Sequence, residues 1–326
     1  MTTKNKYINI NFAPLWKHIR VERTKKEALK TILFSNAPFL FKKFTSFQHW
    51  KSAQVFKENN NENVKQYHLK NNNELQQIKF AIVLHAFYFD LFTEIFSLLP
   101  SYDIVPFKLF ITCPDKLKNK ITQHLNNVSF DFDILTVKNH GRDVLPFLKI
   151  LPQVFEQGFN LVLKIHTKRS NHLNKKDLWS TDLFSKLLGE KNIINAIEVF
   201  KSHPEVGMMG PEGNILPMSL YYGGNATRVK ELCLKMGLKK EQLAGLNFVA
   251  GNMFYARKEV LLPVLKLDFK ESDFEHEDMQ LDSTMAHAIE RIFPAGLILE
   301  NMLLADTSST PEKINCKPTL NHPFTI

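Results

Sequence analysis

Two stretches of the sequence gather side chains that could bind an anion or move a proton. Residues 161–170, LVLKIHTKRS, begin as an apolar strand pattern and end in basic and hydroxyl groups, of which the candidates are Lys164, His166, Thr167 and Lys168. Ligands of open α/β folds bind at the carboxyl ends of strands, so a strand that ends in hydrogen-bond donors predicts an anionic ligand. A solvated basic loop is the alternative for so short a pattern.

The second stretch, residues 274–293, reads FEHEDMQLDSTMAHAIERIF and carries the heaviest acid load. An apolar helical pattern follows these acids, so a helix is expected to begin near Glu277, where its N-terminal dipole favours negative charge. Ordinary helix capping explains most acids in such a position. A carboxylate that removes a proton from a substrate hydroxyl is the catalytic alternative for Glu277, Asp278 or Asp282.

Alternating apolar and helical patterns provide a scaffold for both stretches. Strands are expected at 78–87, 107–113, 132–139 and 161–167, with helices at 90–102, 115–127 and 144–158. This alternation predicts a parallel, doubly wound sheet. The second half is less regular, with helices expected near 190–202 and 225–237, a short strand at 206–210 and a strand at 247–261. No GxxxxGK[ST] or GxGxxG motif follows a strand, which excludes the simplest kinase and dehydrogenase interpretations.

The charge balance favours an anionic partner. The 326 residues include 42 Lys and Arg against 33 Asp and Glu, a formal net charge of +9.

The three cysteines are far apart, so neither a disulfide framework nor a CxxC metal site is indicated, and a reducing compartment is expected. The N-terminus has no signal-peptide pattern, and His85, Asp90 and Glu94 interrupt the most apolar run. The sequence therefore predicts a cytoplasmic protein.

The N-terminal residues 1–57 are both basic and aromatic. They contain twelve Lys or Arg residues but only two acids, Glu22 and Glu27. Such a segment suits a helix lying on an anionic membrane, which would place the protein at the inner face of a bacterial membrane. The alternative is a helical appendage whose apolar face packs on the main domain. With the Asn-rich linker that follows, three regions are expected: 1–76, 77–305 and a C-terminal tail at 306–326.

Five ordered blocks resemble one known family. They are HAFYFDLFTEI at 85–95, NHGRDVLPFL at 139–148, LVLKIHTKRS at 161–170, FVAGNMFYAR at 248–257 and EDMQLDSTMAHAIERIF at 277–293. Their order and spacing resemble the rhamnan synthesis protein F family, over roughly residues 78–300. The resemblance implies a glycosyltransferase that builds rhamnose-containing surface polysaccharide. It also implies a GT-A-like α/β fold, a Rossmann-type and mostly parallel sheet flanked by helices.

The resemblance also bears on the end of the fourth strand. A GT-A fold usually has Asp-x-Asp there, holding a divalent cation against the donor diphosphate. This sequence has His166-Thr167-Lys168 instead, so fixed protein charge is expected to replace the metal, and no cofactor is expected. The literal Asp131-Phe132-Asp133 precedes its strand, which places it at the wrong edge of a parallel sheet for a metal site.

The remaining donor-site candidates come from the ends of other strands. They are His85, Tyr88, Arg142, Asp143, Gly251, Asn252 and His287. Tyr88 could stack on the nucleotide base or pack on the first helix. Arg142 could bind phosphate and Asp143 could cap the next helix, or the two could form an internal pair that only shapes the turn. Gly251, with Asn252 after it, suits a cleft wall, because glycine allows close approach of a ligand. His287 is expected to reach toward the diphosphate.

An inverting transfer needs one carboxylate to deprotonate the acceptor hydroxyl. Asp278 is the first candidate, Glu277 the second and Asp282 the third, because Glu277-Asp278 resembles the Glu-Asp pair that GT-A enzymes often use here. The expected partners are a nucleotide-sugar donor, with rhamnose favoured, and a glycan or lipid-linked acceptor, and no nucleic acid. Another hexose or a furanose as the donor sugar, or a non-enzymatic polyanion- or nucleic-acid-binding protein, is the alternative.

Overall fold

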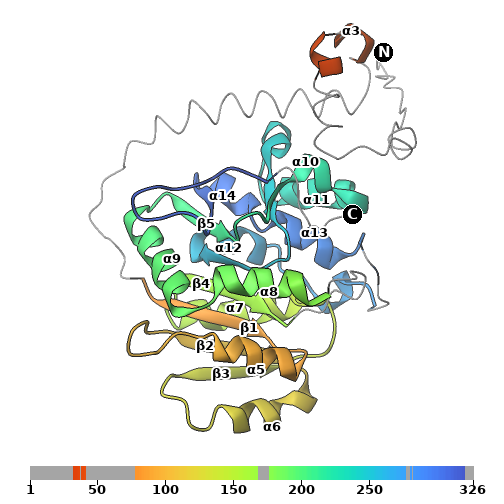
Figure 1. Ribbon diagram of the computed structural model, residues 1–326. Coiled ribbons are helices and arrows are strands. Elements are labelled where there is room, and N and C mark those ends of the chain that lie inside the picture. Colours follow the sequence, from red (N-terminus) through yellow and green to blue (C-terminus); the bar gives the residue numbers. More distant parts are fainter. Residues whose placement is uncertain are drawn as a thin grey trace.

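The structure is a computed structural model that describes residues 32–36, 38–41, 78–167, 176–276, 280 and 282–319. A mixed α/β domain follows the N-terminal stretch (Figure 1). Its central sheet has seven strands in the order β3-β2-β1-β4-β8-β5-β9. The strands are β1 Phe80–His85, β2 Lys108–Cys113, β3 Phe132–Thr136, β4 Leu161–His166, β5 Val206–Gly210, β8 Phe254–Arg257 and β9 Leu303–Asp306.

The sheet is mostly parallel. Strands β1, β2, β3 and β4 pair in parallel, as do β5 and β9, whereas β8 runs antiparallel to both β4 and β5. The four strands expected in the first half are therefore confirmed, and so is the Rossmann-type α/β fold class. Because the carboxyl ends of parallel strands share one edge of a sheet, the ends of β1, β2 and β4 lie side by side.

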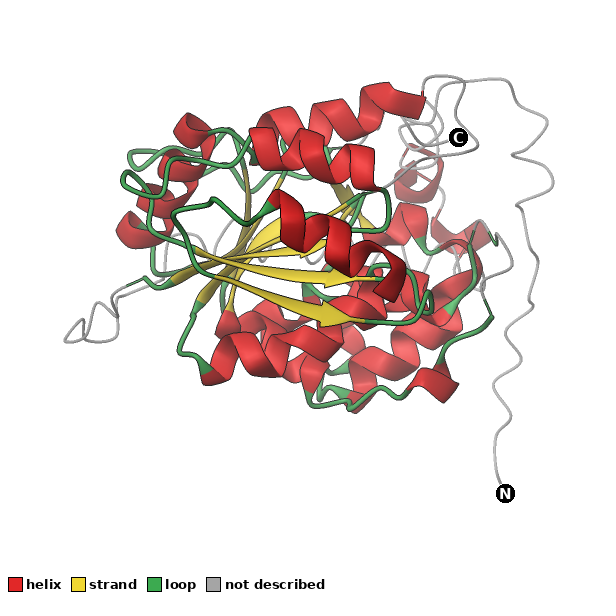
Figure 2. Ribbon diagram, turned by 90° about the horizontal axis from the view of Figure 1, so that it is seen from below, coloured by secondary structure: helices red, strands yellow, loops and turns green. Residues whose placement is uncertain are grey.

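Helices cover both faces of the sheet (Figure 2). The helices are α3 Pro38–Phe41, α5 Phe89–Ser97, α6 Asp115–His124, α7 Val144–Glu156, α8 Lys176–Leu187, α9 Glu190–Ser202, α10 Met218–Tyr221, α11 Ala226–Lys235, α12 Lys258–Leu265, α13 Met285–Ile292 and α14 Ala295–Leu299. Strand side chains alternate between two cores. Ala81 and Val83 face the core that includes α7, α12 and α13, while Ile82 and Leu84 face the core that includes α5, α8 and α9. This alternation follows from the two-residue period of a strand.

The continuous strand expected at 247–261 is wrong. Residues Asn247–Val249 form β7, which pairs with β6, Ile215–Pro217, in a separate two-stranded sheet. The chain then turns through Gly251 and Asn252, whose φ angles of 87° and 55° are incompatible with a strand, before β8 enters the main sheet. Asn252 therefore lies in a sharp turn.

The helix expected to begin near Glu277 is also wrong. Helix α13 begins at Met285, and Thr284 is its N-cap, with a side-chain oxygen that accepts from the His287 backbone N–H at 3.4 Å. The His287 side chain reaches back toward the Thr284 backbone and takes the place that Glu or Gln has in a capping box. Asp282 precedes the helix, so it shares no helical face with its neighbours. Glu277 and Asp278 lie outside the described residues.

Residues following β9 pack against the domain. Ile314 and Cys316 pack against the core that includes α5, α8 and α9, and the backbone N–H of Thr319 donates to the Ile215 carbonyl at 2.7 Å. Within the described ranges, no helix is long and apolar enough to cross a membrane.

Candidate active site

The first cluster of site residues lies where β2, β1 and β4 end. His85 is in register with Thr112 of β2 and with His166 of β4. His85 Nδ1 lies 2.9 Å from Thr112 Oγ1. Burial lowers the pKa of His85 to about 4, an effect that nearby Lys164 reinforces and Asp143 opposes. His85 is therefore neutral near pH 7 and serves as a fixed hydrogen-bonding group.

Asp143 is the centre of this cluster. Its Oδ2 accepts from Lys164 Nζ at 2.6 Å and from Asn252 Nδ2 at 2.7 Å, and lies 3.5 Å from His166 Nε2. Asp143 immediately precedes α7, but its side chain makes no capping hydrogen bond, so that expectation is wrong. The carboxylate instead joins the loop after β3, the end of β4 and the turn between β7 and β8.

Lys164 is a buried cation with protein partners. The residue is 1% exposed, and its ammonium also donates to the Asn252 carbonyl at 2.8 Å. The rings of Phe147 and Phe254 have their centroids 5.2 and 5.9 Å from Nζ. A buried charge is tolerated only when it is paired and hydrogen-bonded, and Asp143 provides the paired charge.

The end of β4 holds the neighbouring turns. His166 Nε2 lies 3.0 Å from the Gly251 carbonyl oxygen, to which it can donate. Thr167 Oγ1 accepts from the backbone N–H groups of Phe87 and Tyr88 at 2.7 and 3.0 Å, which fixes the chain as it leaves β1. Lys168 lies outside the described residues.

The Tyr88 ring lies at the exit from β1. It packs edge-on against Phe87 with the ring centroids 5.0 Å apart, and its residue is half-buried. Gly251 packs closely on α8, because a Cβ there would lie 2.8 Å from the side chain of Leu183. Glycine is thus required by a protein contact and by the positive φ of this residue.

A second cluster begins at Arg142, the neighbour of Asp143. Arg142 Nη2 donates to the Gln280 carbonyl oxygen, and Arg142 Nη1 lies 3.0 Å from His287 Nε2. A guanidinium can only donate, so His287 Nε2 is the acceptor and carries no proton. The other ring nitrogen, Nδ1, then carries the proton and donates to Thr284 Oγ1 at 2.8 Å. Arg142 thereby joins the loop after β3 to the acidic stretch and to α13.

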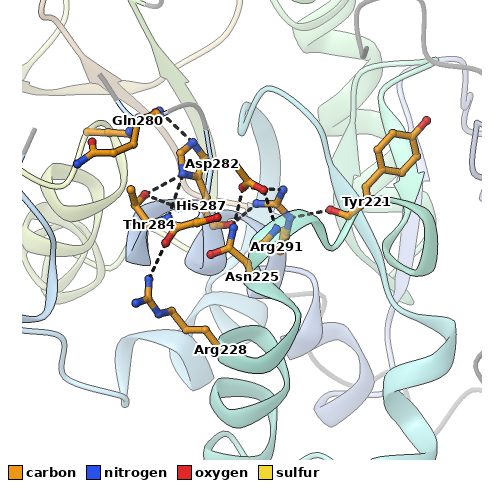
Figure 3. A network of polar contacts seen from close by, with 11 residues as sticks. Tyr221, Asn225, Arg228, Gln280, Asp282, Thr284, His287 and Arg291 are labelled. Carbon is orange, nitrogen blue, oxygen red and sulfur yellow. Dashed lines mark hydrogen bonds and ion pairs between the residues drawn. The ribbon is translucent and has the colours of Figure 1, made fainter. Parts of the chain in front are cut away.

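Asp282 is held by three donors (Figure 3). Its carboxylate accepts from the Gly224 N–H at 3.0 Å, from Asn225 Nδ2 at 2.7 Å and from Arg291 Nη2 at 3.2 Å. Burial opposes ionisation of Asp282, but the Gly224 hydrogen bond and the Arg291 charge outweigh it and lower the pKa of the carboxyl. Both oxygens serve to hold a loop, which disfavours Asp282 as a base.

Two glycines allow this close approach. A Cβ at Gly223 would lie 2.0 Å from Asp282 Oδ2, and one at Gly224 would lie 2.0 Å from Ser283 Oγ. The Gly-Gly-Asn sequence at 223–225 signals a tight turn, but it does not reveal that the turn meets a segment nearly 60 residues later. Sequence reasoning therefore missed Asn225.

Glu275 anchors the other end of the acidic stretch. Its Oε1 pairs with Arg228 Nη1 at 2.7 Å, and its Oε2 accepts from the Met285 N–H at 2.8 Å. Burial raises the pKa of this carboxyl, but the Met285 hydrogen bond and Arg228 lower it by more. Figure 3 shows Arg228 and Arg291 approaching the acidic stretch from α11 and α13. The sequence patterns also do not predict Arg228 and Arg291 as site residues, because neither has a local sequence signal.

The acids at the amino-terminal edge of the sheet have a different role. Asp133 pairs with Lys108 at 3.1 Å and accepts from Gln153 and Gln157, each at 2.8 Å. Phe132 and Asp133 lie inside β3 and do not precede it, but Asp131-Phe132-Asp133 is at the start of that strand, away from the strand ends that gather the site residues, as expected. Among the residues that the structure describes, no three His, Cys, Asp or Glu side chains are grouped to hold a metal ion.

Comparison with known proteins identifies the family. The sequence pattern that defines the rhamnan synthesis protein F family matches residues 40–298. The chain belongs to the rhamnan synthesis protein F family. The family resemblance inferred from the five sequence blocks is thereby confirmed.

Two curated relatives are similar to this rhamnan synthesis protein F family member. Both carry the name "Uncharacterized protein WxcX" and come from two strains of Xanthomonas campestris pv. campestris. Each is 33% identical over 211 residues, which make up 65% of this chain and 30% of the relative. The chain therefore spans less than a third of the length of the relatives that it matches.

The family match covers both clusters. All site candidates, from His85 at the end of β1 to His287 in α13, lie inside residues 40–298 of this family member. The structure brings His85, Asp143, Lys164, His166, Gly251 and Asn252 into the first cluster, and Arg142, Asp282 and His287 into the second. Since Arg142 and Asp143 are adjacent, one loop links the two clusters.

Proposed function

We propose that this chain is a glycosyltransferase that moves a sugar, with rhamnose favoured, from a nucleotide-sugar donor to a growing cell-surface polysaccharide or lipopolysaccharide glycan. The observation that carries the proposal is the gathering of the loop after β3, the end of β4, the 250–252 turn and the acidic stretch. In an open α/β sheet these strand ends are where a ligand binds. Membership of the rhamnan synthesis protein F family supports a polysaccharide as the product.

The donor diphosphate would lie over the strand ends. Arg142 is the described cation best suited to it, because a guanidinium can fork onto phosphate oxygens, and Lys168 would add a second positive charge. Lys164, His166, Thr167 and Asn252 are buried, and together with Asp143 they would act mainly by holding the loops that bind the diphosphate. Tyr88 and His85 would lie on the nucleoside side, and His287 would act through Arg142.

The general base would be Asp278, with Glu277 as the second candidate. Both acids lie between Glu275 and Gln280, and these two residues are each tied to the domain by an arginine. The base takes the proton from the acceptor hydroxyl, the acceptor oxygen bonds to the anomeric carbon, and the bond from that carbon to the diphosphate oxygen breaks. The diphosphate leaves with the bonding electron pair, and the configuration inverts.

Binding measurements distinguish this function from its alternatives. A thermal-shift panel of nucleotide sugars and oligonucleotides on the full chain should show stabilisation by one or a few nucleotide sugars. At a ligand concentration of about 100 times Kd, the stabilisation should be about 2.7 kcal/mol. Stabilisation by oligonucleotides alone would support the polyanion-binding alternative. Stabilisation by a nucleotide that bears another hexose or a furanose would show that this sugar, and not rhamnose, is the donor sugar.

Metal independence is a separate part of the proposal. Fixed cations such as Arg142 and Lys168 would stabilise the departing diphosphate in place of a divalent ion. Transfer should therefore survive EDTA, and Lys168→Ala should weaken binding of the nucleotide sugar. Transfer that EDTA abolishes and Mn²⁺ or Mg²⁺ restores would disprove metal independence while leaving the sugar transfer itself in place.

A further inference from the structure

Large apolar side chains are exposed on two short helical pieces near the N-terminus. In residues 32–36, Ile32 is 56% exposed and Leu33 is 39% exposed, and in α3, Phe39 is 71% exposed and Leu40 is 60% exposed. Across the part of the chain that the structure describes, only Ile104 and Ile194 are also large, apolar and exposed. Four of these six side chains thus lie within residues 32–41, which is far from an even distribution.

This stretch has an inner and an outer side. Phe34 is 7% exposed, so one side chain of the first helical piece is buried while its neighbours Ile32 and Leu33 face outward. A helical appendage that packs its apolar face on the domain would bury such side chains, because their burial is what stabilises the packing. It therefore does not account for the four exposed side chains.

The surrounding sequence is strongly basic. Residues 25–43 read KKEALKTILFSNAPFLFKK, in which five lysines flank the apolar side chains and Glu27 is the one acid. A binding partner that matches this pattern must have an apolar layer next to negative charge. An anionic lipid surface offers both, since apolar side chains enter the boundary between headgroups and acyl chains while lysines remain at the headgroup phosphates.

We propose that residues 32–41 dock this protein on an anionic lipid surface. Ile32, Leu33, Phe39 and Leu40 insert between the headgroups, and the flanking lysines pair with the lipid phosphates. The proposal goes beyond the sugar transfer and does not depend on it.

Co-sedimentation of the full chain with vesicles tests the proposal. Vesicles of phosphatidylcholine alone are compared with vesicles that contain one third phosphatidylglycerol. Phe39→Glu/Leu40→Glu removes two exposed apolar side chains and adds two negative charges. Ile104→Glu/Ile194→Glu makes the same change at the other two exposed positions and is the matched control. The melting temperature of each variant shows that its domain is folded.

The proposal predicts that the wild type and the Ile104→Glu/Ile194→Glu control pellet with the anionic vesicles, and that binding falls as salt rises. Phe39→Glu/Leu40→Glu should bind at least about tenfold more weakly. Neutralising Lys42 and Lys43 with glutamine should cost about fivefold for each lysine. Equal binding by the wild type and Phe39→Glu/Leu40→Glu would overturn the proposal. Lipid-independent dimers that Phe39→Glu/Leu40→Glu abolishes, without vesicle binding, would overturn it in favour of a second copy of the chain.

Discussion

At the scale of single residues, the polar side chains of the site form hydrogen bonds and ion pairs mostly with one another. One oxygen of Asp143 serves both Lys164 and Asn252, and the carboxylates of Glu275 and Asp282 hold loops in place. A base must have an oxygen free to accept a proton, so anchored carboxylates make poor bases. This is why the proposed base is sought at Asp278 or Glu277, between the anchored positions.

Removal of the buried ammonium should destabilise the domain. Lys164→Met keeps most of the side-chain length but leaves the Asp143 carboxylate without its cation. Breaking a buried pair by removing one partner typically costs about 3–5 kcal/mol. Urea unfolding measures this loss. Lys201→Met is the matched control, because it breaks an exposed pair with Glu198 and should cost less than about 0.5 kcal/mol. Equal stability of the two variants would show that Lys164 is not the pairing partner inferred.

His85 should make stability depend on pH. Its pKa in the folded state is about 4, below the ordinary value of 6.5, so the unfolded chain binds a proton that the folded chain does not. The free energy of unfolding should therefore fall as pH drops from about 6.5 to about 4, by about 3 kcal/mol from this group. His85→Gln should lack that part of the pH dependence. Parallel curves for the wild type and His85→Gln would contradict the burial of a neutral imidazole.

At the scale of elements, the turn at 223–225 positions the acidic stretch. Gly223→Ala would place a methyl group against Asp282 and would also force alanine into a positive φ of 55°. Gly213→Ala is the matched control, because its φ is 80° but nothing lies within 4 Å of the added Cβ. The control should cost about 1–2 kcal/mol of backbone strain. Gly223→Ala should cost at least about 1 kcal/mol more and should also reduce sugar transfer. Equal effects would show that contact with Asp282 is unimportant.

The sequence predicted those elements that local patterns determine. The first four strands and the helices between them were correct because each combines an apolar run with a clear break. The pattern at 247–261 predicts one strand because both halves are apolar, and only the φ angles at Gly251 and Asn252 separate them. The pattern misplaces the start of α13 because His287 stands where the usual capping-box signature has Glu or Gln.

The candidate site was less predictable than the fold. Strand-end reasoning gathered His85, Lys164 and His166 correctly, because parallel strands bring their carboxyl ends to one edge. It could not predict that Lys164 forms an ion pair with Asp143, because this pair depends on how the turn after β3 meets the end of β4. Long-range partners such as Asn225 and Arg291 of Asp282 likewise follow from tertiary packing.

At the scale of the whole molecule, the two hydrophobic cores fix the positions of the strand ends that carry the site. Helices on both faces of the sheet hold the ends of β1, β2 and β4 in register, and the loops that carry Arg142 and Asp282 lie beside this edge. Sites supported by strands and helices hold a substrate more accurately than sites on unsupported loops. The proposed membrane-docking residues that the structure describes, 32–36 and 38–41, belong to neither core.

The most direct test of the account is sugar transfer by Asp278→Asn. The full chain is given the nucleotide sugar found by the binding panel and a glycan acceptor, and the release of nucleoside diphosphate and the mass of the glycan are followed. Because Asp278→Asn keeps the size of the side chain and removes its basicity, kcat should fall by at least about 100-fold while donor affinity is unchanged. Turnover close to that of the wild type, or a loss of donor affinity instead, would contradict the assignment of the base and the proposed placement of the donor.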